Sequence, residues 1–324
     1  MSRNATLDIL KALGILLVII GHNTSGLLFQ YIYSFHMPMF FILAGYLYKE
    51  KGILDSITHD FKRIILPYLL YFVVLSLFNN LCYGITISRL IQDVIKISWG
   101  SVIRLDIYGH HVQGVGYLWF LPALFVCKNV FNIIYRVWKP TTHSYGMYVC
   151  MYVCMLVGVL IHHKLFPLPF AITTGLNALG YYTIGQLMTV FIKNISLLDK
   201  IKWYYKLIIF LAWMILGKYA LNGMGTCDYR FVLMDYLAGV AGTMVFYYIA
   251  LMINKKMQTT GKGLAIIGRY TISILIIHQL VATLIWHVKL EFNALGMIFI
   301  TCLVAIIYVT MAYNLRNLLI NRNL

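Results

Sequence analysis

Three ionisable residues interrupt the first long apolar run of the sequence, "LDILKALGILLVIIGHN" at residues 7–23. Lys11 and His22 are eleven positions apart, and at 100° per residue this spacing places both side chains on one face of an α-helix. Their separation along the helix axis is roughly 16 Å, and Asp8 lies about one turn before Lys11 on the same side. A neutral imidazole can accept a proton from a hydroxyl group, which is the role of a general base in acyl transfer. Alternatively, Asp8 and Lys11 form an i,i+3 ion pair at the start of a helix.

Three further ionisable residues fall at a comparable depth in other apolar segments: His36 in "YSFHMPMFF", Asp235 in "FVLMDYLAG" and His278 in "ISILIIHQLV". Helical rise places His22 and His278 roughly 21–22 Å from the inner boundary of their spans, and His36 and Asp235 roughly 5–6 Å below the outer boundary. Ionisable side chains are costly inside a membrane and usually face the interior of a helix bundle, so together they predict one functional layer. In the alternative interpretation, each reaches the headgroup region from a helix end and has no chemical role.

Transmembrane helices must position these residues, because 61% of the 324 residues are hydrophobic and only 11% are charged. Soluble domains contain about 25% charged residues, so the composition predicts an all-α integral membrane protein with a single domain over residues 1–324. The first apolar run lacks a signal-peptide cleavage pattern and is expected to be a retained span. The six cysteines are scattered, mostly within apolar runs, which favours buried thiols over a disulfide framework or a metal site.

Ten apolar segments are predicted as spans, since about 20 apolar residues cross the hydrocarbon core of a bilayer. They are residues 7–28, 33–48, 64–83, 115–137, 144–162, 170–192, 203–220, 231–253, 264–289 and 295–318. With ten spans, eighteen basic residues fall on one side of the membrane and seven on the other, so the positive-inside rule predicts that both termini are cytoplasmic. The net charge of +16 could suggest nucleic acid or anionic lipid as a partner, but this distribution attributes it to topology.

The longest predicted loop covers residues of about 84–114 and faces outward. Apolar residues recur within it at helical spacing, which predicts an amphipathic helix lying at the outer interface: Ile87, Leu90, Ile91, Val94 and Ile95. At the opposite, cytoplasmic side, Lys62 and Arg63 join Lys11 as residues able to hold an anionic cosubstrate by its phosphates.

The motifs "LDILKALGILLVIIGHN", "FHMPMFFILAGYLY" and "FKRIILPYLLYF" resemble the acyltransferase-3 superfamily of bacterial membrane O-acyltransferases, and within it the fucose 4-O-acetylase-like group. The resemblance extends to "GYLWFLPALF", "GYYTIGQLM" and "IGRYTISILIIHQL", and so covers nearly the whole chain. The family's first-span pattern of a basic residue, ten residues and a histidine matches Lys11 and His22, with lysine in place of the commoner arginine. The R-x-x-R element that many members carry at the entry to the third span is incomplete, because Asp60 stands three residues before Arg63.

This resemblance implies transfer of an acyl group, most often acetyl, from cytoplasmic acyl-CoA to a sugar hydroxyl of a cell-surface polysaccharide or its lipid-linked precursor. The protein would act in the bacterial cytoplasmic membrane, with acyl-CoA, a glycan acceptor and membrane lipid as partners and without nucleic acid, metal or a permanently bound cofactor. His22 would be the general base or a transient acyl carrier, and His36 is the second catalytic candidate. The CoA cosubstrate would be bound by Asp8, Lys11, Lys62 and Arg63, and the acceptor-side candidates are Asp235, His278 and Trp119. The outer loop would help to select the acceptor.

Two other classes of function stay open at this point. A proton-coupled transporter, or a flippase for glycans or lipids, would use the same intramembrane layer for passage. Inverted repeats and paired broken helices would favour that class, and the sequence shows neither. The third class is a sensor or scaffold built on an inactive acyltransferase fold, which the presence of both Lys11 and His22 argues against.

Overall fold

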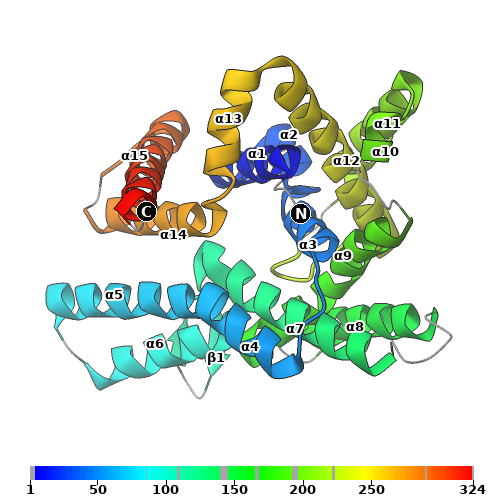
Figure 1. Ribbon diagram of the computed structural model, residues 1–324. Coiled ribbons are helices and arrows are strands. Elements are labelled where there is room, and N and C mark those ends of the chain that lie inside the picture. Colours follow the sequence, from blue (N-terminus) through cyan, green and yellow to red (C-terminus); the bar gives the residue numbers. More distant parts are fainter. Residues whose placement is uncertain are drawn as a thin grey trace. The chain divides into compact units, whose positions relative to one another are not determined.

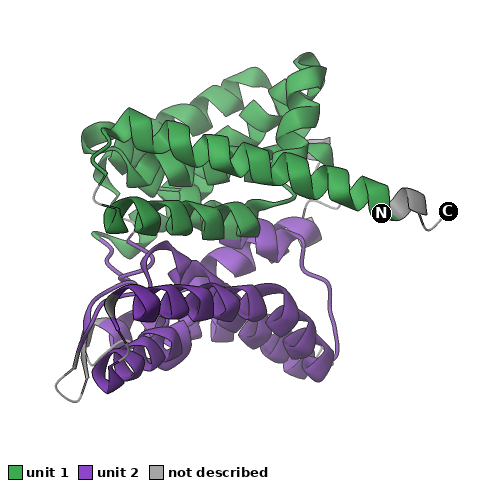
Figure 2. Cartoon of the chain, turned by 90° about the vertical axis from the view of Figure 1, so that its left-hand side faces the viewer, with its two compact units in different colours: residues 1–40, 195–221, 230–324 green, residues 41–194, 222–229 purple. Residues whose placement is uncertain are grey.

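The computed structural model describes residues 4–84, 86–107, 110–138, 145–164, 168–191, 196–220, 223–288 and 290–322 (Figure 1). Four basic residues used above to predict the orientation, Arg3, Lys139, Lys193 and Lys289, lie outside the described residues. The chain folds into two compact units, shown in green and purple in Figure 2. Unit 1 consists of residues 1–40, 195–221 and 230–324, and unit 2 consists of residues 41–194 and 222–229. The all-α architecture is confirmed. Among the described residues, the named β-strands form one small two-stranded sheet.

The helices of unit 1 come from both ends of the sequence. They are α1 (Ala5–His22), α2 (Gly26–Tyr33), α10 (Ser196–Asp199), α11 (Trp203–Tyr219), α12 (Val232–Lys256), α13 (Gln258–Ile267), α14 (Thr271–His287) and α15 (Ala294–Arg322). Helix α3 (His36–Tyr46) begins in unit 1 and ends in unit 2.

Unit 2 contains the middle of the sequence. Its elements are α4 (Ile53–Asp60), the π-helix η1 (Phe61–Ile65), α5 (Leu66–Tyr83), α6 (Ile87–Trp99), β1 (Leu105–Ile107), β2 (His110–Val112), the 3₁₀-helix η2 (Gly116–Trp119), α7 (Phe120–Trp138), α8 (Tyr145–Lys164), the 3₁₀-helix η3 (Pro169–Ala171) and α9 (Ile172–Phe191). Strands β1 and β2 pair antiparallel, with Leu105 opposite Val112.

Seven helical segments of the described chain are long and apolar enough to cross a membrane, and an eighth arises if α13 and α14, bent by 70° at their junction, form one span. The seven are Ala5–His22, Gly26–Tyr46, Ile53–Cys82, Gly116–Trp138, Tyr145–His162, Val232–Lys256 and Ala294–Leu319. Two further predicted spans, 170–192 and 203–220, correspond to α9 and α11. Helix α9 carries buried polar residues such as Asn177 and Thr183, and α11 has only 17 residues. A multi-pass membrane protein is therefore confirmed, while the number ten and the cytoplasmic termini stay predictions.

The first span ends earlier than predicted, and the second span begins earlier than predicted. Helix α1 stops at His22, because the side chain of Asn23 donates to the carbonyl of Ile19 at 2.8 Å and its backbone N–H donates to the carbonyl of Ile20 at 3.0 Å. The second span then starts at Gly26, whose φ of +68° suits glycine. The predicted boundaries of 28 and 33 were therefore wrong. As a consequence, His36 lies near the middle of the span Gly26–Tyr46, and not close to its outer boundary.

A break between α2 and α3 sets the position of His36. Pro38 has no N–H group and therefore cannot donate to the carbonyl four residues earlier, which favours a break at this point. The broken turn is packed in unit 1: Trp213 of α11 donates its indole N–H to the hydroxyl of Ser34 at 3.1 Å, and Phe35 packs against Gly242 of α12. A Cβ at Gly242 would lie only 2.5 Å from Phe35, so the close approach requires glycine.

Helix α6 forms where the apolar spacing predicts it, but it does not lie across the end of α5. The hydroxyl of Tyr68 donates to the carbonyl of Ile97 at 2.9 Å, and the hydroxyl of Ser76 donates to the carboxylate of Asp93 at 2.6 Å. These pairs run in opposite directions along the two helices, so α6 folds back antiparallel beside α5, as Figure 1 also shows. That this helix lies at the outer interface stays a prediction. Its packing along α5 was not predicted, because sequence spacing reveals an apolar face but not what packs beside it.

Candidate active site

Three histidines of unit 1 meet where α1 ends. His22, the last residue of α1, stacks on His278 of α14 with ring centroids 5.6 Å apart. The ring of Tyr33, the last residue of α2, lies 5.8 Å from His22 and 4.7 Å from His36, the first residue of α3. His36 and His278 are almost fully buried. The structure therefore confirms that His22 and His278 share one layer and brings His36 to it through Tyr33.

The tautomer of His36 follows from its backbone contact. Its Nδ1 lies 2.8 Å from the carbonyl oxygen of Ile32. A carbonyl can only accept, so Nδ1 must carry the hydrogen and donate it. A neutral His36 consequently has its lone pair on Nε2, where it can accept a proton.

Tyr33 is a site residue that the sequence interpretation missed. Its hydroxyl lies 2.8 Å from Nδ1 of His22, within hydrogen-bonding distance. Its ring is fixed by stacking on Phe29, with centroids 3.9 Å apart. Tyr33 stands three residues before His36, and this spacing is the sequence signal that could have placed it on the same side of the span. A hydroxyl can orient an imidazole without placing a charge in the membrane, as a carboxylate would.

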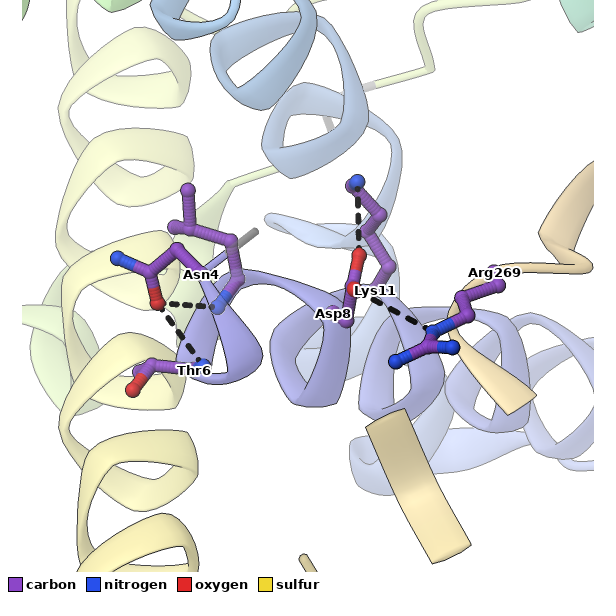
Figure 3. Close-up of polar contacts among 6 residues, drawn as sticks. Asn4, Thr6, Asp8, Lys11 and Arg269 are labelled. Carbon is purple, nitrogen blue, oxygen red and sulfur yellow. Dashed lines mark hydrogen bonds and ion pairs between the residues drawn. The ribbon is translucent and has the colours of Figure 1, made fainter. Parts of the chain in front are cut away.

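The other end of α1 carries a charged cluster (Figure 3). Asp8 is almost fully buried, and one of its carboxylate oxygens accepts from the ammonium group of Lys11 at 3.3 Å. Nε of Arg269, which lies between α13 and α14, is 3.9 Å from the second oxygen. Figure 3 shows the carboxylate between the two cations. The predicted i,i+3 pair of Asp8 and Lys11 is therefore present, and Arg269 was not predicted to join it.

Helices α1 and α14 contact each other and run in the same direction, because the start and the end of α1 are approached in turn by Arg269, just before α14, and by His278, in the middle of α14. At one end Arg269 approaches Asp8, and at the other end His278 stacks on His22. The rise of a helix gives roughly 16 Å between Lys11 and His22, and roughly 13 Å between Arg269 and His278. Unit 1 thus presents a cationic end and a histidine end on the same pair of helices.

The contacts that the structure gives for Asp235 are structural: its carboxylate holds the backbone at the start of α12. Its carboxylate accepts from the backbone N–H groups of Arg230 at 2.9 Å and Phe231 at 3.3 Å, directly before α12. These N–H groups lie at the N-cap and the residue before it, where the helix itself offers them no acceptor. The predicted contribution of Asp235 to acceptor binding stays untested.

The remaining predicted site residues lie in unit 2. Lys62 and Arg63 belong to the π-helix η1 and are exposed, and their side chains form no hydrogen bond or ion pair with other residues that the structure describes. Asp60, the last residue of α4, is buried, and its carboxylate accepts from the ammonium group of Lys128 of α7 at 2.7 Å. Trp119 is largely buried, and a Cβ at Gly225 would lie 3.0 Å from its indole ring. That these residues share a site with the charged residues of unit 1 stays a prediction.

No group of three or more His, Cys, Asp or Glu side chains suitable for a metal ion occurs within the described ranges. A comparison with protein-family models gives one finding: the family described as "Acyltransferase domain" matches residues 4–313. No curated protein and no solved structure matches the chain significantly.

Proposed function

Because the chain belongs to the acyltransferase-3 superfamily, whose model covers residues 4–313, we propose that this membrane acyltransferase uses cytoplasmic acetyl-CoA as its donor. The acceptor is a sugar hydroxyl of a cell-surface polysaccharide or its lipid-linked precursor, and the protein acts in the bacterial cytoplasmic membrane. The single observation that carries this proposal is the pairing of α1 with α14, which places cations at one end and histidines at the other.

This arrangement matches the chemistry of an acyl-CoA molecule. The nucleotide end of CoA is anionic, and its thioester stands at the far end of an extended, uncharged arm. Lys11 would attract the phosphates as a point charge, while the exposed Lys62 and Arg63 are further phosphate-binding candidates. The roughly 16 Å between Lys11 and His22 is comparable to the length of the extended arm.

The histidine end supplies the proton transfers. In the proposed reaction, Nε2 of His22 accepts the proton of the sugar hydroxyl while that oxygen attacks the thioester carbonyl. The tetrahedral intermediate collapses, the carbon–sulfur bond breaks, and the imidazolium returns its proton to the departing thiolate, which gives the ester and free CoA. Tyr33 accepts a hydrogen bond from Nδ1 of His22 and so keeps Nε2 available. In the alternative route, His22 first carries the acetyl group and His36 serves as the base.

The test is acetyl-CoA turnover by purified protein in nanodiscs, followed as release of free CoA without added acceptor. We expect His22→Ala to lose turnover by about 100-fold or more while acetyl-CoA binding is retained. Lys11→Ala should instead weaken binding. His162→Ala is a matched control, because His162 belongs to α8 in unit 2 and contacts the hydroxyl of Thr173. A wild-type protein that neither binds nor cleaves acetyl-CoA would refute the proposal.

One observation favours the transporter alternative. The 70° bend between α13 and α14 resembles the broken helices that line substrate sites in transporters. Family membership weighs against passage as the whole function. Counterflow of a labelled sugar into vesicles, without loss of acetyl-CoA, would support the transporter instead.

A further inference from the structure

The junction between α13 and α14 is fixed against the cationic end of α1. A Cβ added to Gly268 would lie 1.8 Å from the carbonyl oxygen of Asp8, so the backbones of the two segments are in direct contact. Asn254 of α12 strengthens this end of the unit by donating to the hydroxyl of Thr6 at 3.0 Å. The next residue after Gly268 is Arg269, whose place beside Asp8 is therefore set by backbone packing.

The charges at this junction do not cancel. One buried carboxylate is shared by two cations, Lys11 and Arg269, which leaves a net charge of +1. The side chain of Asp8 is 3% exposed, whereas those of Lys11 and Arg269 are 23% and 36% exposed. The acid is thus covered while both cations reach an accessible surface.

The geometry of Arg269 suits an oxyanion with two acceptor atoms. Its contact with Asp8 is made by Nε, at 3.9 Å, and this contact leaves the two terminal nitrogens of the guanidinium for another partner. A guanidinium can bind two phosphate oxygens at once, whereas a lysine offers a single point charge. Helix α14 begins two residues later without a side-chain cap, so its N-terminal dipole adds to the positive potential.

We propose that Arg269, together with Lys11, binds a phosphate group of the acyl-CoA donor at the junction of α13 and α14. Asp8 is a positioning residue that holds the two cations apart. This inference rests on the proposed function, and it assigns donor recognition to a residue 258 positions from Lys11 in the sequence.

The experiment compares two donors in nanodiscs: acetyl-CoA, and S-acetylpantetheine, which has the same thioester arm without phosphates. We expect Arg269→Gln to raise the KM for acetyl-CoA by roughly 10- to 100-fold, the range of a lost charge-assisted hydrogen-bond pair, and to leave kcat within about twofold. The kcat/KM for S-acetylpantetheine should not change. Arg269→Lys, which keeps the charge but not the fork, should give an intermediate KM. Arg316→Gln, an exposed arginine of α15, is the control and should behave as wild type.

Three outcomes would overturn the inference. The first is an unchanged KM for acetyl-CoA in Arg269→Gln while wild type turns over normally. The second is an equal loss with both donors, because it would indicate a merely structural role. The third is a phosphate contact from lipid: phosphatidylglycerol nanodiscs would then stabilise wild type more than Arg269→Gln, with no difference in KM. Wild type inactive with either donor would instead refute the proposed function itself.

Discussion

Replacing Tyr33 by phenylalanine tests whether its hydroxyl positions the proposed base. The change removes only the oxygen that lies 2.8 Å from Nδ1 of His22, while the stacking of the ring on Phe29 can persist. A neutral hydrogen bond contributes about 1 kcal/mol, and a bond to a charged partner is about twice as strong. If His22 becomes charged during the reaction, the variant loses roughly 1–1.4 kcal/mol more in the transition state than in the ground state. We therefore expect kcat to fall roughly five- to tenfold.

The assay is the release of free CoA from acetyl-CoA, quantified by chromatography for four proteins: wild type, Tyr33→Phe, His22→Ala and the double variant. The KM for acetyl-CoA should not change, because Tyr33 contacts the histidine end of α1. In the His22→Ala background the tyrosine change should have no further effect, since its partner is gone. Tyr31→Phe is the matched control: it removes a hydrogen bond of 2.9 Å from the same helix to the carbonyl of Met214. A wild-type rate in Tyr33→Phe, or an equal loss with and without His22, would refute the reasoning.

Three other predictions concern stability and reactivity. Gly185→Ala places a Cβ 2.0 Å from a backbone oxygen of α3, so we expect the free energy of unfolding to fall by about 1–3 kcal/mol and the unfolding temperature to drop. Gly263→Ala is the control: open space surrounds Gly263, so this change should not destabilise the protein. Lys128→Met leaves the buried Asp60 without its nearest cation and should lower the free energy of unfolding by roughly 3 kcal/mol. In thermal unfolding, the double variant Lys128→Met with Asp60→Asn should recover most of this loss. If the single and double variants were equally unstable, the pairing would be contradicted. Burial raises the pKa of Cys227 to about 12, so this thiol is protonated at pH 7 and should resist maleimide in the native protein. It should react readily after unfolding in detergent. Peptide mass spectrometry distinguishes Cys227 from the exposed Cys82, and labelling of Cys227 itself in the native protein at pH 7 would contradict the prediction.

The helical face of α1 could be predicted from sequence, because Lys11 and His22 lie within one uninterrupted run whose geometry is fixed by the backbone alone. The end of that helix could not. Hydropathy averaged over a span carried the prediction past the polar residues 23–26 to residue 28, and it does not detect that Asn23 caps the last turn. This local error moved the expected depth of His36.

Contacts between distant segments are the part of the site that the sequence could not supply. Arg269 is counted from sequence only as a basic residue of a loop, and its place beside Asp8 depends on the packing of Gly268 against α1. Tyr33 is one of 25 tyrosines, and its three-residue spacing from His36 is the single local signal that separates it from those of an aromatic belt. Helix α6 shows the same limit, since its range follows from apolar spacing while its course along α5 depends on pairs such as Ser76 and Asp93.

The π-helix η1 has a consequence for the length of the chain between Asp60 and α5. A π-turn contains one residue more than an α-turn, so it changes the phase between the helix before it and the helix after it. If the same five residues, Phe61–Ile65, formed an α-turn instead, Asp60 would be rotated by about 100° relative to α5. The carboxylate would then no longer face Lys128. Conversely, deleting one residue within Phe61–Ile65 converts the π-turn into an α-turn and keeps Asp60 directed at Lys128, so such a deletion should be tolerated better than a deletion within α5 itself.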